Sequence, residues 1–186
     1  MIDHFGLIAP FYDRVFKTGD ISKLIDCLKL DYGEFVLDAG GGTGRIGSAL
    51  RKIGMNIIVV DASFRMLQLA RGEKDLRSVC CLAENMAFQN ESFDRIMMID
   101  TFHHVRNQIK TVKELWRIVK PGGRIVIQEP DINNIAVKLI AMFEKLLGMR
   151  SKFLEAEILI AMFEGANSSY YVERTDFHYY AIIQKD

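Results

Sequence analysis

The stretch Phe35-Val36-Leu37-Asp38-Ala39-Gly40-Gly41-Gly42-Thr43-Gly44 decides the fold of this chain of 186 residues. A short apolar run ends in a cluster of glycines, and a helical pattern continues to Ile53. Because glycine has no Cβ, the backbone can turn sharply here, and a ligand can lie against it beside the free N–H groups of the next helix. An ordinary turn needs one or two glycines, not four. The stretch therefore predicts a ligand-binding loop at the carboxyl end of a strand.

Outward from this loop, short apolar runs rich in β-branched residues alternate with stretches of helical period, which predicts βαβ units. We expect strands at 35–39, 56–61, 78–83, 94–100 and 124–128, and a hairpin of 169–174 with 177–184. The expected helices are 44–53, 64–71, 108–119, 132–147 and 151–163. These elements predict an α/β fold with a doubly wound, Rossmann-like, seven-stranded, mainly parallel sheet that ends in an antiparallel C-terminal hairpin.

No feature of the sequence marks a domain boundary, so we expect one domain over residues 1–186. Residues 1–30 are expected to form a helical N-terminal lid. Residues 131–166 are expected to form a helical insertion before the last two strands.

Composition narrows the class of partner. Lys plus Arg and Asp plus Glu each number 24, so no net charge favours a nucleic acid, and a small-molecule substrate is expected. The cysteines are odd in number, and the adjacent Cys80 and Cys81 cannot form a relaxed disulfide with each other, which favours a reducing, cytoplasmic setting. We expect neither a signal peptide nor a membrane span, because no run approaches about 18 apolar residues.

Asp61 is the second feature of a nucleotide site, since it ends the next strand 19 residues after Gly42. A carboxylate there can accept hydrogen bonds from both ribose hydroxyls. The segment Gly42-Thr43-Gly44-Arg45-Ile46-Gly47 also spells G-x-G-x-x-G, which keeps a nicotinamide-dependent oxidoreductase as the alternative. Asp38 argues against that alternative, because a carboxylate at the mouth of the loop would repel a pyrophosphate and attract an amino group or a sulfonium.

Further motifs follow the loop in order: Val60-Asp61-Ala62-Ser63 with Met66, Ala83-Glu84-Asn85-Met86-Ala87-Phe88, Ser92-Phe93-Asp94, Phe102-His103-His104-Val105, and Leu115-Trp116-Arg117-Ile118-Val119-Lys120-Pro121-Gly122-Gly123. Together with the glycine loop, these motifs resemble class I S-adenosylmethionine-dependent methyltransferases. They are most like the ubiquinone/menaquinone biosynthesis branch, also described as methyltransferase type 11. The resemblance covers roughly residues 5–130 and is far more specific than one glycine motif.

The resemblance implies S-adenosylmethionine as cofactor and methyl transfer to a small organic acceptor, which the helices of residues 132–163 indicate to be apolar. It implies cofactor-binding roles for Tyr12, Asp38, Ala39, Gly40, Gly42, Asp61, Ala62, Met66, Ala83, Glu84, Asn85, Asp100 and Thr101. In these roles Asp38 and Gly40 hold the amino-acid end, Asp61 holds the ribose and Met66 packs on the adenine. Tyr12 closes over the cofactor, or simply packs an N-terminal helix. One departure is Leu82, which stands where the family usually has an aspartate that accepts from the adenine amino group.

The catalytic candidates are His103 and His104, which follow the fourth strand. Methyl transfer from a sulfonium needs alignment, exclusion of water and, for a weak nucleophile, a base. Either histidine could be that base, or the pair could only shape its loop. No metal site is expected, because no cysteine or carboxylate stands at ligand spacing from the pair. His4 and His178, near the two ends of the chain, are predicted to be structural.

The apolar helices of residues 132–163 suggest where the acceptor binds. They carry more apolar residues than one core-facing stripe needs, which indicates either core packing together with a homodimer face or a lid over an apolar acceptor. We expect the acceptor between these helices and the His103-His104 loop, in a pocket with few charges lined by Phe102, Met142, Phe143 and Phe163. The methylated atom, the oligomeric state and a non-catalytic, cofactor-binding role all stay open.

Overall fold

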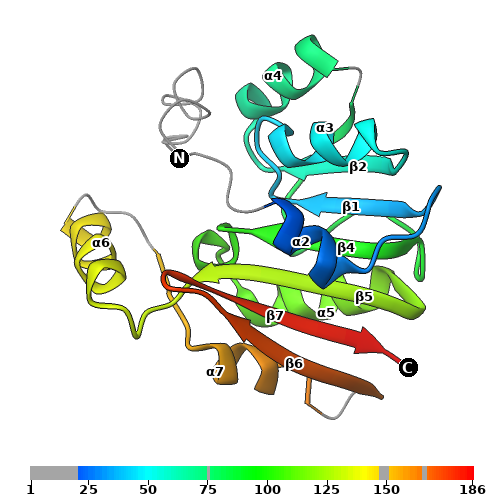
Figure 1. Ribbon diagram of the computed structural model, residues 1–186. Coiled ribbons are helices and arrows are strands. Elements are labelled where there is room, and N and C mark those ends of the chain that lie inside the picture. The colour runs from blue at the N-terminus through cyan, green and yellow to red at the C-terminus, as the bar shows by residue number, and fades with distance from the viewer. Residues whose placement is uncertain (1–20, 75, 147–150, 165–166) are drawn as a thin grey trace.

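The computed structural model describes residues 21–74, 76–146, 151–164 and 167–186. Its strands form one seven-stranded sheet in the order β3-β2-β1-β4-β5-β7-β6 (Figure 1). Strands β1 to β5 pair in parallel, and the hairpin of β6 and β7 adds to β5 in antiparallel pairing. The strands are β1 (Phe35–Ala39), β2 (Asn56–Asp61), β3 (Arg77–Cys80), β4 (Phe93–Ile99), β5 (Val119–Pro130), β6 (Ser168–Arg174) and β7 (His178–Lys185). This topology confirms the doubly wound, mainly parallel α/β fold.

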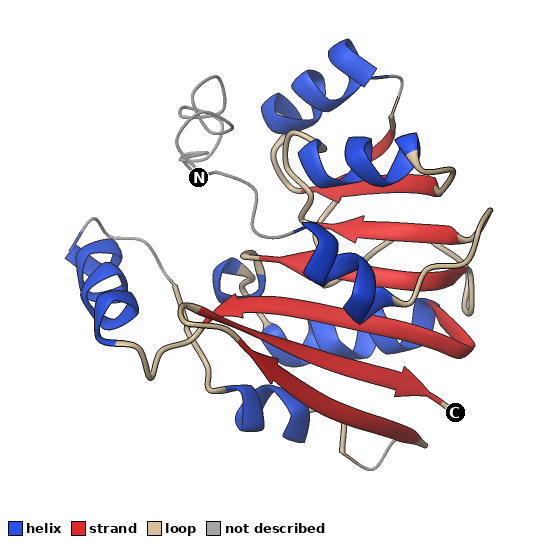
Figure 2. Cartoon of the chain, in the orientation of Figure 1, coloured by secondary structure: helices blue, strands red, loops and turns tan. Residues whose placement is uncertain are grey.

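Helices cover both faces of the sheet (Figure 2). Alternation along each strand produces the two layers: in β1, Val36 packs in one core cluster and Leu37 in the other. The first face carries α2 (Ile21–Leu28), α3 (Arg45–Lys52) and α4 (Phe64–Lys74), and the second carries α5 (Gln108–Ile118) and α7 (Ala156–Ala161). We refer to them as the α2 face and the α5 face. None of the helices in the described part of the chain is long and apolar enough to cross a membrane.

The expected N-terminal lid and helical insertion lie partly outside the described residues and stay predictions. Residues 1–20, with Tyr12, lie outside the described residues, and α2 packs Leu24, Cys27 and Leu28 into the core. Between β5 and β6 stand α6 (Ile135–Leu146) and α7, and α6 lies apart from the sheet in Figure 1.

Side-chain hydrogen bonds explain why the second half of the chain departs from the expected bounds. The helix expected from residue 132 begins at Ile135, because Asp131 Oδ1 accepts the N–H of Asn133 and Asn134 Oδ1 accepts that of Ala136. The helix expected over 151–163 shrinks to α7. Lys152 is held in extended chain, since its N–H donates to His103 O at 2.7 Å and its carbonyl accepts from Gln108 Nε2 at 2.8 Å.

The single tryptophan, Trp116, lies near the carboxyl end of α5, at the amino edge of the parallel strands. Lys185 Nζ stands 5.2 Å from the centre of its ring and donates to its carbonyl at 3.1 Å. The Phe163 ring meets the indole edge-on, with centres 6.3 Å apart. Trp116 therefore joins α5 to the end of β7 and to the segment after α7.

Candidate functional site

The glycine loop connects β1 to α3 and is fixed between the ends of β2 and β4. Gly40 has φ of 76°, and its N–H donates to Val60 O at 2.7 Å. A Cβ on Gly40 would stand 2.2 Å from Thr101 Cγ2, a separation that no real contact allows. Thr101 Oγ1 in turn stands 3.1 Å from Gly40 O as donor. The loop therefore needs glycine at residue 40, because the side chain of Thr101, just after β4, lies against it.

Gly42 differs from Gly40, because in the described part of the chain no atom crowds the position that a Cβ would take. Its φ is 56°, and a Cβ there would meet nothing closer than Asp61 Oδ2 at 3.9 Å. Its N–H donates to Asp61 Oδ2 at 2.9 Å, and the N–H of Ser63 donates to Asp61 Oδ1 at 2.7 Å. Asp61, half-buried at the end of β2, thus holds two backbone turns, and its carboxylate stands beside Gly42.

Asp38 lies beneath the glycine loop, which corrects its expected place at the mouth. It shares the α2 face with Val36, is 2 % exposed, and has its carboxyl group directly under Gly41 and beside Gly47 of α3. Among the described residues its Oδ2 has no hydrogen-bond partner. Burial and the nearby charge of Asp61 raise the pKa of Asp38 to about 7. The glycine loop therefore stands between the Asp38 carboxyl group and any ligand that binds above the loop.

The remaining residues expected around the adenine differ in exposure. Met66 is 3 % exposed and belongs to the interior, whereas Ala62 and Asn85 are exposed and Ala83 is half-buried. Glu84 Oε1 accepts the N–H groups of Arg106 and Asn107, at 2.8 and 3.1 Å, so its carboxylate fixes the loop before α5. Leu82 is 41 % exposed beside them.

A buried carboxylate that sequence reasoning missed organises the end of β4. Glu129, 2 % exposed near the end of β5, accepts the N–H of Phe102 at 2.8 Å and the N–H of His103 at 3.1 Å. Its Oε2 also stands 2.6 Å from His103 Nδ1. The 3₁₀ turn η1 (Phe102–His104) is thus held by one side chain from the next strand. A signal was present: Gln128-Glu129 follows the apolar run of β5 as Asp38 and Asp61 follow theirs.

The two candidate bases are both packed into this turn. His103 stacks on the Phe153 ring with centres 4.3 Å apart and is 3 % exposed. The ring of His104 lies 3.9 Å from that of His103, and its Nδ1 is 3.2 Å from Ser151 Oγ. Burial, and then the charge of His103, lower the pKa of His104 to about 3, so it is neutral and only weakly basic at pH 7. Catalysis by either stays a prediction, and the geometry favours a role in fixing the turn.

Asp100, at the end of β4, is the more accessible carboxylate of this edge. Its φ is 49°, which is unusual for a residue with a side chain, and strain of this kind is concentrated at functional sites. Gln128 Nε2 lies 3.3 and 3.4 Å from its two carboxylate oxygens, and His178 Nε2 lies 3.6 Å from Oδ1. Its side chain is 41 % exposed.

The expected lining of the acceptor pocket is wrong in two of its members. Phe102 and Phe163 are 1 % and 2 % exposed and pack in the core of the α5 face, because η1 and the segment after α7 fold inward. Met142 is 58 % exposed on α6, and the side chain of Phe143 lies outside the described part of the structure. The same edge carries Asp100, Glu129, Asp131 and His178. It is therefore richer in charge than the sequence analysis predicted.

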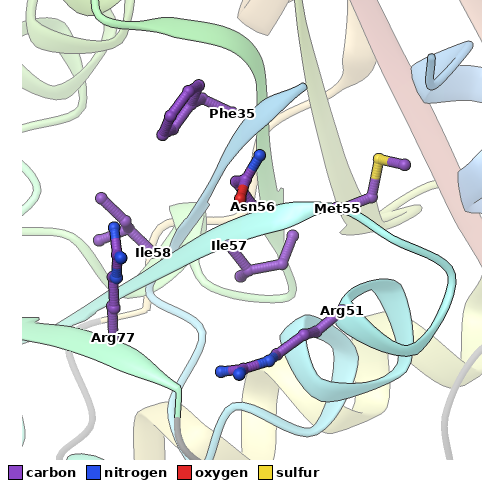
Figure 3. Close-up of a pocket in the computed structure, with 7 residues that line it drawn as sticks. All are labelled: Phe35, Arg51, Met55, Asn56, Ile57, Ile58 and Arg77. Atoms are coloured by element: carbon purple, nitrogen blue, oxygen red, sulfur yellow. The ribbon is translucent and has the colours of Figure 1, made fainter. Parts of the chain in front are cut away.

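A cavity of about 140 Å³ lies elsewhere, at the amino ends of β1, β2 and β3 (Figure 3). Its walls are Phe35, Arg51, Met55, Asn56, Ile57, Ile58 and Arg77. It is separated from the glycine loop by the length of the strands, so it is not part of the candidate site.

Comparison with known proteins fits this geometry. A family model described as a methyltransferase domain matches residues 37–127, from β1 into β5. The demethylmenaquinone methyltransferase of Tropheryma whipplei is 36% identical over an alignment of 137 residues that covers 67% of this chain and 56% of that protein. The ubiquinone/menaquinone biosynthesis C-methyltransferase UbiE of Vibrio vulnificus is 29% identical over an alignment of 142 residues that covers 67% of this chain and 55% of that one.

The chain belongs to the class I methyltransferase family. Within that family it falls in the UbiE-like branch, and it spans about half the length of the curated relatives it matches. A solved Thermotoga maritima structure, described as a SAM-dependent methyltransferase and possible histamine N-methyltransferase, superposes with a TM-score of 0.81 over 98% of each chain. At 22% identity that likeness shows the shared fold alone.

Proposed function

We propose that the chain binds S-adenosylmethionine at the glycine loop and transfers its methyl group to a small organic acceptor. The observation that supports this most is the uncrowded Cβ position of Gly42 among the described residues, next to the carboxylate of Asp61. A ribose fits there, because an ionised carboxylate accepts several hydrogen bonds and can serve two hydroxyls while it retains the loop N–H. The orphaned Oδ2 of Asp38 fits a cationic amino acid above the loop, since a positive charge would compensate the buried carboxylate.

The residues of the chain bind and orient in this proposal. Asp61 and Gly42 hold the ribose, the backbone at Gly40 and Thr101 meets the amino-acid end, and the exposed Asn85 is available to the adenine in place of the missing aspartate at Leu82. When bound, S-adenosylmethionine supplies an electrophilic methyl group on sulfur. Asp100 and η1 flank the same edge and limit where an acceptor can stand.

Calorimetry with S-adenosylmethionine, S-adenosylhomocysteine and NADH tests the proposal. We expect a dissociation constant in the micromolar range, about −7 to −8 kcal/mol, for the first two, and much weaker binding of NADH. Asp61→Ala should weaken the first two by roughly 1–3 kcal/mol, the cost of leaving polar groups unpaired. Equal or tighter binding of NADH would revive the oxidoreductase alternative.

The acceptor is proposed only as a class, and a turnover panel separates enzyme from non-catalytic binder. Reduced demethylmenaquinone and histamine belong in the panel, because proteins similar to this chain carry those names. Methyl transfer from labelled S-adenosylmethionine to any member supports the enzyme. Binding without transfer to a broad panel supports the non-catalytic role.

Two further observations bear on the cellular setting and the oligomeric state. The three cysteines are free thiols in the structure, which supports the proposed cytoplasmic setting. The exposed apolar side chains of Ile135, Leu139 and Met142 on α6 support a test for a homodimer.

A further inference from the structure

We propose that His178, oriented by Asp100, is the base that takes the acceptor's proton. This inference rests on the proposed methyl transfer and adds a catalytic residue to it. His178 opens β7 at the tip of the hairpin and stands in register with Pro130, so the antiparallel pairing brings it to the carboxyl edge of the parallel strands. A residue 78 positions away in sequence thus meets Asp100 with Nε2 3.6 Å from Oδ1.

Strand alternation puts His178 on the α2 face. In β5 and β7, Val126, Tyr180 and Ile182 pack in the α2-face cluster, and Gln128 and His178 follow them in the same period. Glu129 and Tyr179 lie on the α5 face. There both oxygens of the Glu129 carboxylate accept backbone N–H groups of η1. Two carboxylates at this edge therefore differ in role. Glu129 is buried and holds η1, whereas Asp100 is accessible and faces His178.

Hydrogen bonds fix the backbone from which the imidazole projects. The backbone N–H of His178 donates to Thr175 Oγ1 at 3.1 Å, and the backbone N–H of Asp131 donates to the carbonyl of the neighbouring Phe177 at 2.8 Å. The ionisable groups near the hairpin tip include Asp176 in the turn itself, Asp100 after β4, Glu129 and Asp131 at the end of β5, Arg174 at the end of β6, and His103 on η1. The side chain of His178 is 34 % exposed, against 4 % for His103.

The position also lies near the proposed methyl donor. Asp100 precedes Thr101, whose Oγ1 stands 3.1 Å from Gly40 O in the glycine loop. Nε2 of His178 faces Asp100, so a hydrogen bond there would set the tautomer and leave Nδ1 to accept a proton. The present 3.6 Å is longer than a hydrogen bond, and such catalytic contacts commonly tighten when ligands bind.

The proposed step moves a methyl group to the acceptor and a proton to His178. The acceptor's nucleophilic atom loses its hydrogen as a proton to His178 and keeps the electron pair of that bond. With this pair it forms a bond to the methyl carbon, and the carbon–sulfur bond breaks with its electrons going to sulfur. This base suits an acceptor whose nucleophile carries a weakly acidic hydrogen, such as a hydroxyl or a thiol.

Chemical modification tests the placement without turnover. Diethyl pyrocarbonate acylates accessible neutral imidazoles, and peptide mass spectrometry assigns each site. We expect His178 to react several-fold faster than His103, and saturating S-adenosylhomocysteine to slow the reaction of His178 at least twofold. An unreactive His178, or one that S-adenosylhomocysteine does not protect although calorimetry shows it bound, overturns the inference alone. Failure of S-adenosylhomocysteine to bind overturns the proposed function and the inference with it.

Turnover of reduced demethylmenaquinone, or of whichever panel member is methylated, tests the role. His178→Ala should lower kcat about 10²–10⁴-fold with cofactor affinity unchanged, and added imidazole should restore part of the rate. Asp100→Asn should lower kcat less and should not respond to imidazole, because the base itself is still present. His104→Ala should show no imidazole rescue either. A His178→Ala rate within twofold of the native rate, or rescue confined to His104→Ala, overturns the assignment.

Discussion

The two halves of the carboxyl edge are built in different ways. The loop half, at the ends of β1 to β3, uses backbone: Gly40 and Gly42 in left-handed conformations, with Asp61 accepting two N–H groups. The network half, at the ends of β4, β5 and β7, uses side chains that meet across the sheet, chiefly Glu129 with η1 and Asp100 with His178. The first arrangement leaves space for a ligand, whereas the second fills its interior. Substitutions in the loop half should therefore change affinity, and substitutions at Glu129 should change stability.

The largest effect is expected from Glu129→Ala. It leaves the N–H groups of Phe102 and His103, and the His103 ring, without their common buried acceptor. Breaking a buried charged network of this kind costs about 3–5 kcal/mol. Urea unfolding monitored by circular dichroism measures the loss. Glu84→Ala is the matched control, because it also removes a carboxylate that accepts two N–H groups, at a more exposed site, and should cost about 1 kcal/mol. Equal losses would contradict the distinction.

Asp38→Asn tests the carboxyl group beneath the loop through its dependence on pH. Since the pKa of Asp38 is raised to about 7 in the folded protein, the folded state holds this proton more tightly than the unfolded state does. Its contribution to the free energy of unfolding is full below pH 4 and is lost as the pH rises toward 7 and above. The neutral asparagine has no such loss, so its stability relative to the native protein should rise by about 2–4 kcal/mol between pH 4 and pH 8. A difference that does not vary with pH would mean that Asp38 titrates normally.

Gly40→Ala and Gly42→Ala sharpen the comparison within the loop itself. Both residues have positive φ, but only the Cβ at residue 40 meets Thr101. Gly40→Ala should cost about 2–3 kcal/mol of stability, and Gly42→Ala about 1 kcal/mol from backbone strain. Gly42→Ala should nevertheless weaken the binding of S-adenosylmethionine about tenfold or more, because the alanine methyl group occupies the position beside Asp61 where the ribose is proposed to bind. Thermal melts and calorimetry on both variants measure the two effects. Unchanged affinity of Gly42→Ala for S-adenosylmethionine would mean that the ligand does not bind beside Gly42.

The smallest effect is expected from Leu82→Asp. It places an acceptor where the family usually has one, and Leu82 is 41 % exposed, so the change adds little strain. We expect binding of S-adenosylmethionine to tighten by about 0.5–1.5 kcal/mol, the net value of one hydrogen bond. Weaker binding with unchanged thermal stability would mean that another group already accepts from the adenine.

The sequence predicted the loop half well because its information is local. The apolar runs of β1 and β2 were placed at their observed bounds, and Gly40, Gly42 and Asp61 occupy the strand ends that the pattern indicates. Three details differed: the direction of the Asp38 side chain, for which the alternation of β1 accounts, the burial of Met66, and the end of β3 at Cys80. The network half depends on pairs such as Glu129 with His103 and Asp100 with His178, which no local pattern joins. The shortened α7 has the same cause, since Lys152 is held by His103 and Gln108 across the fold.

Trp116 gives this protein a built-in spectroscopic reporter whose signal concerns folding and not ligand binding. Its indole lies between Lys185 and Phe163 at the amino edge of the sheet, while the proposed ligands bind at the opposite edge. Emission should therefore change when β7 separates from α5 and stay constant through a ligand titration. A ligand titration followed by tryptophan emission would therefore show no change in intensity, even when the site is fully occupied.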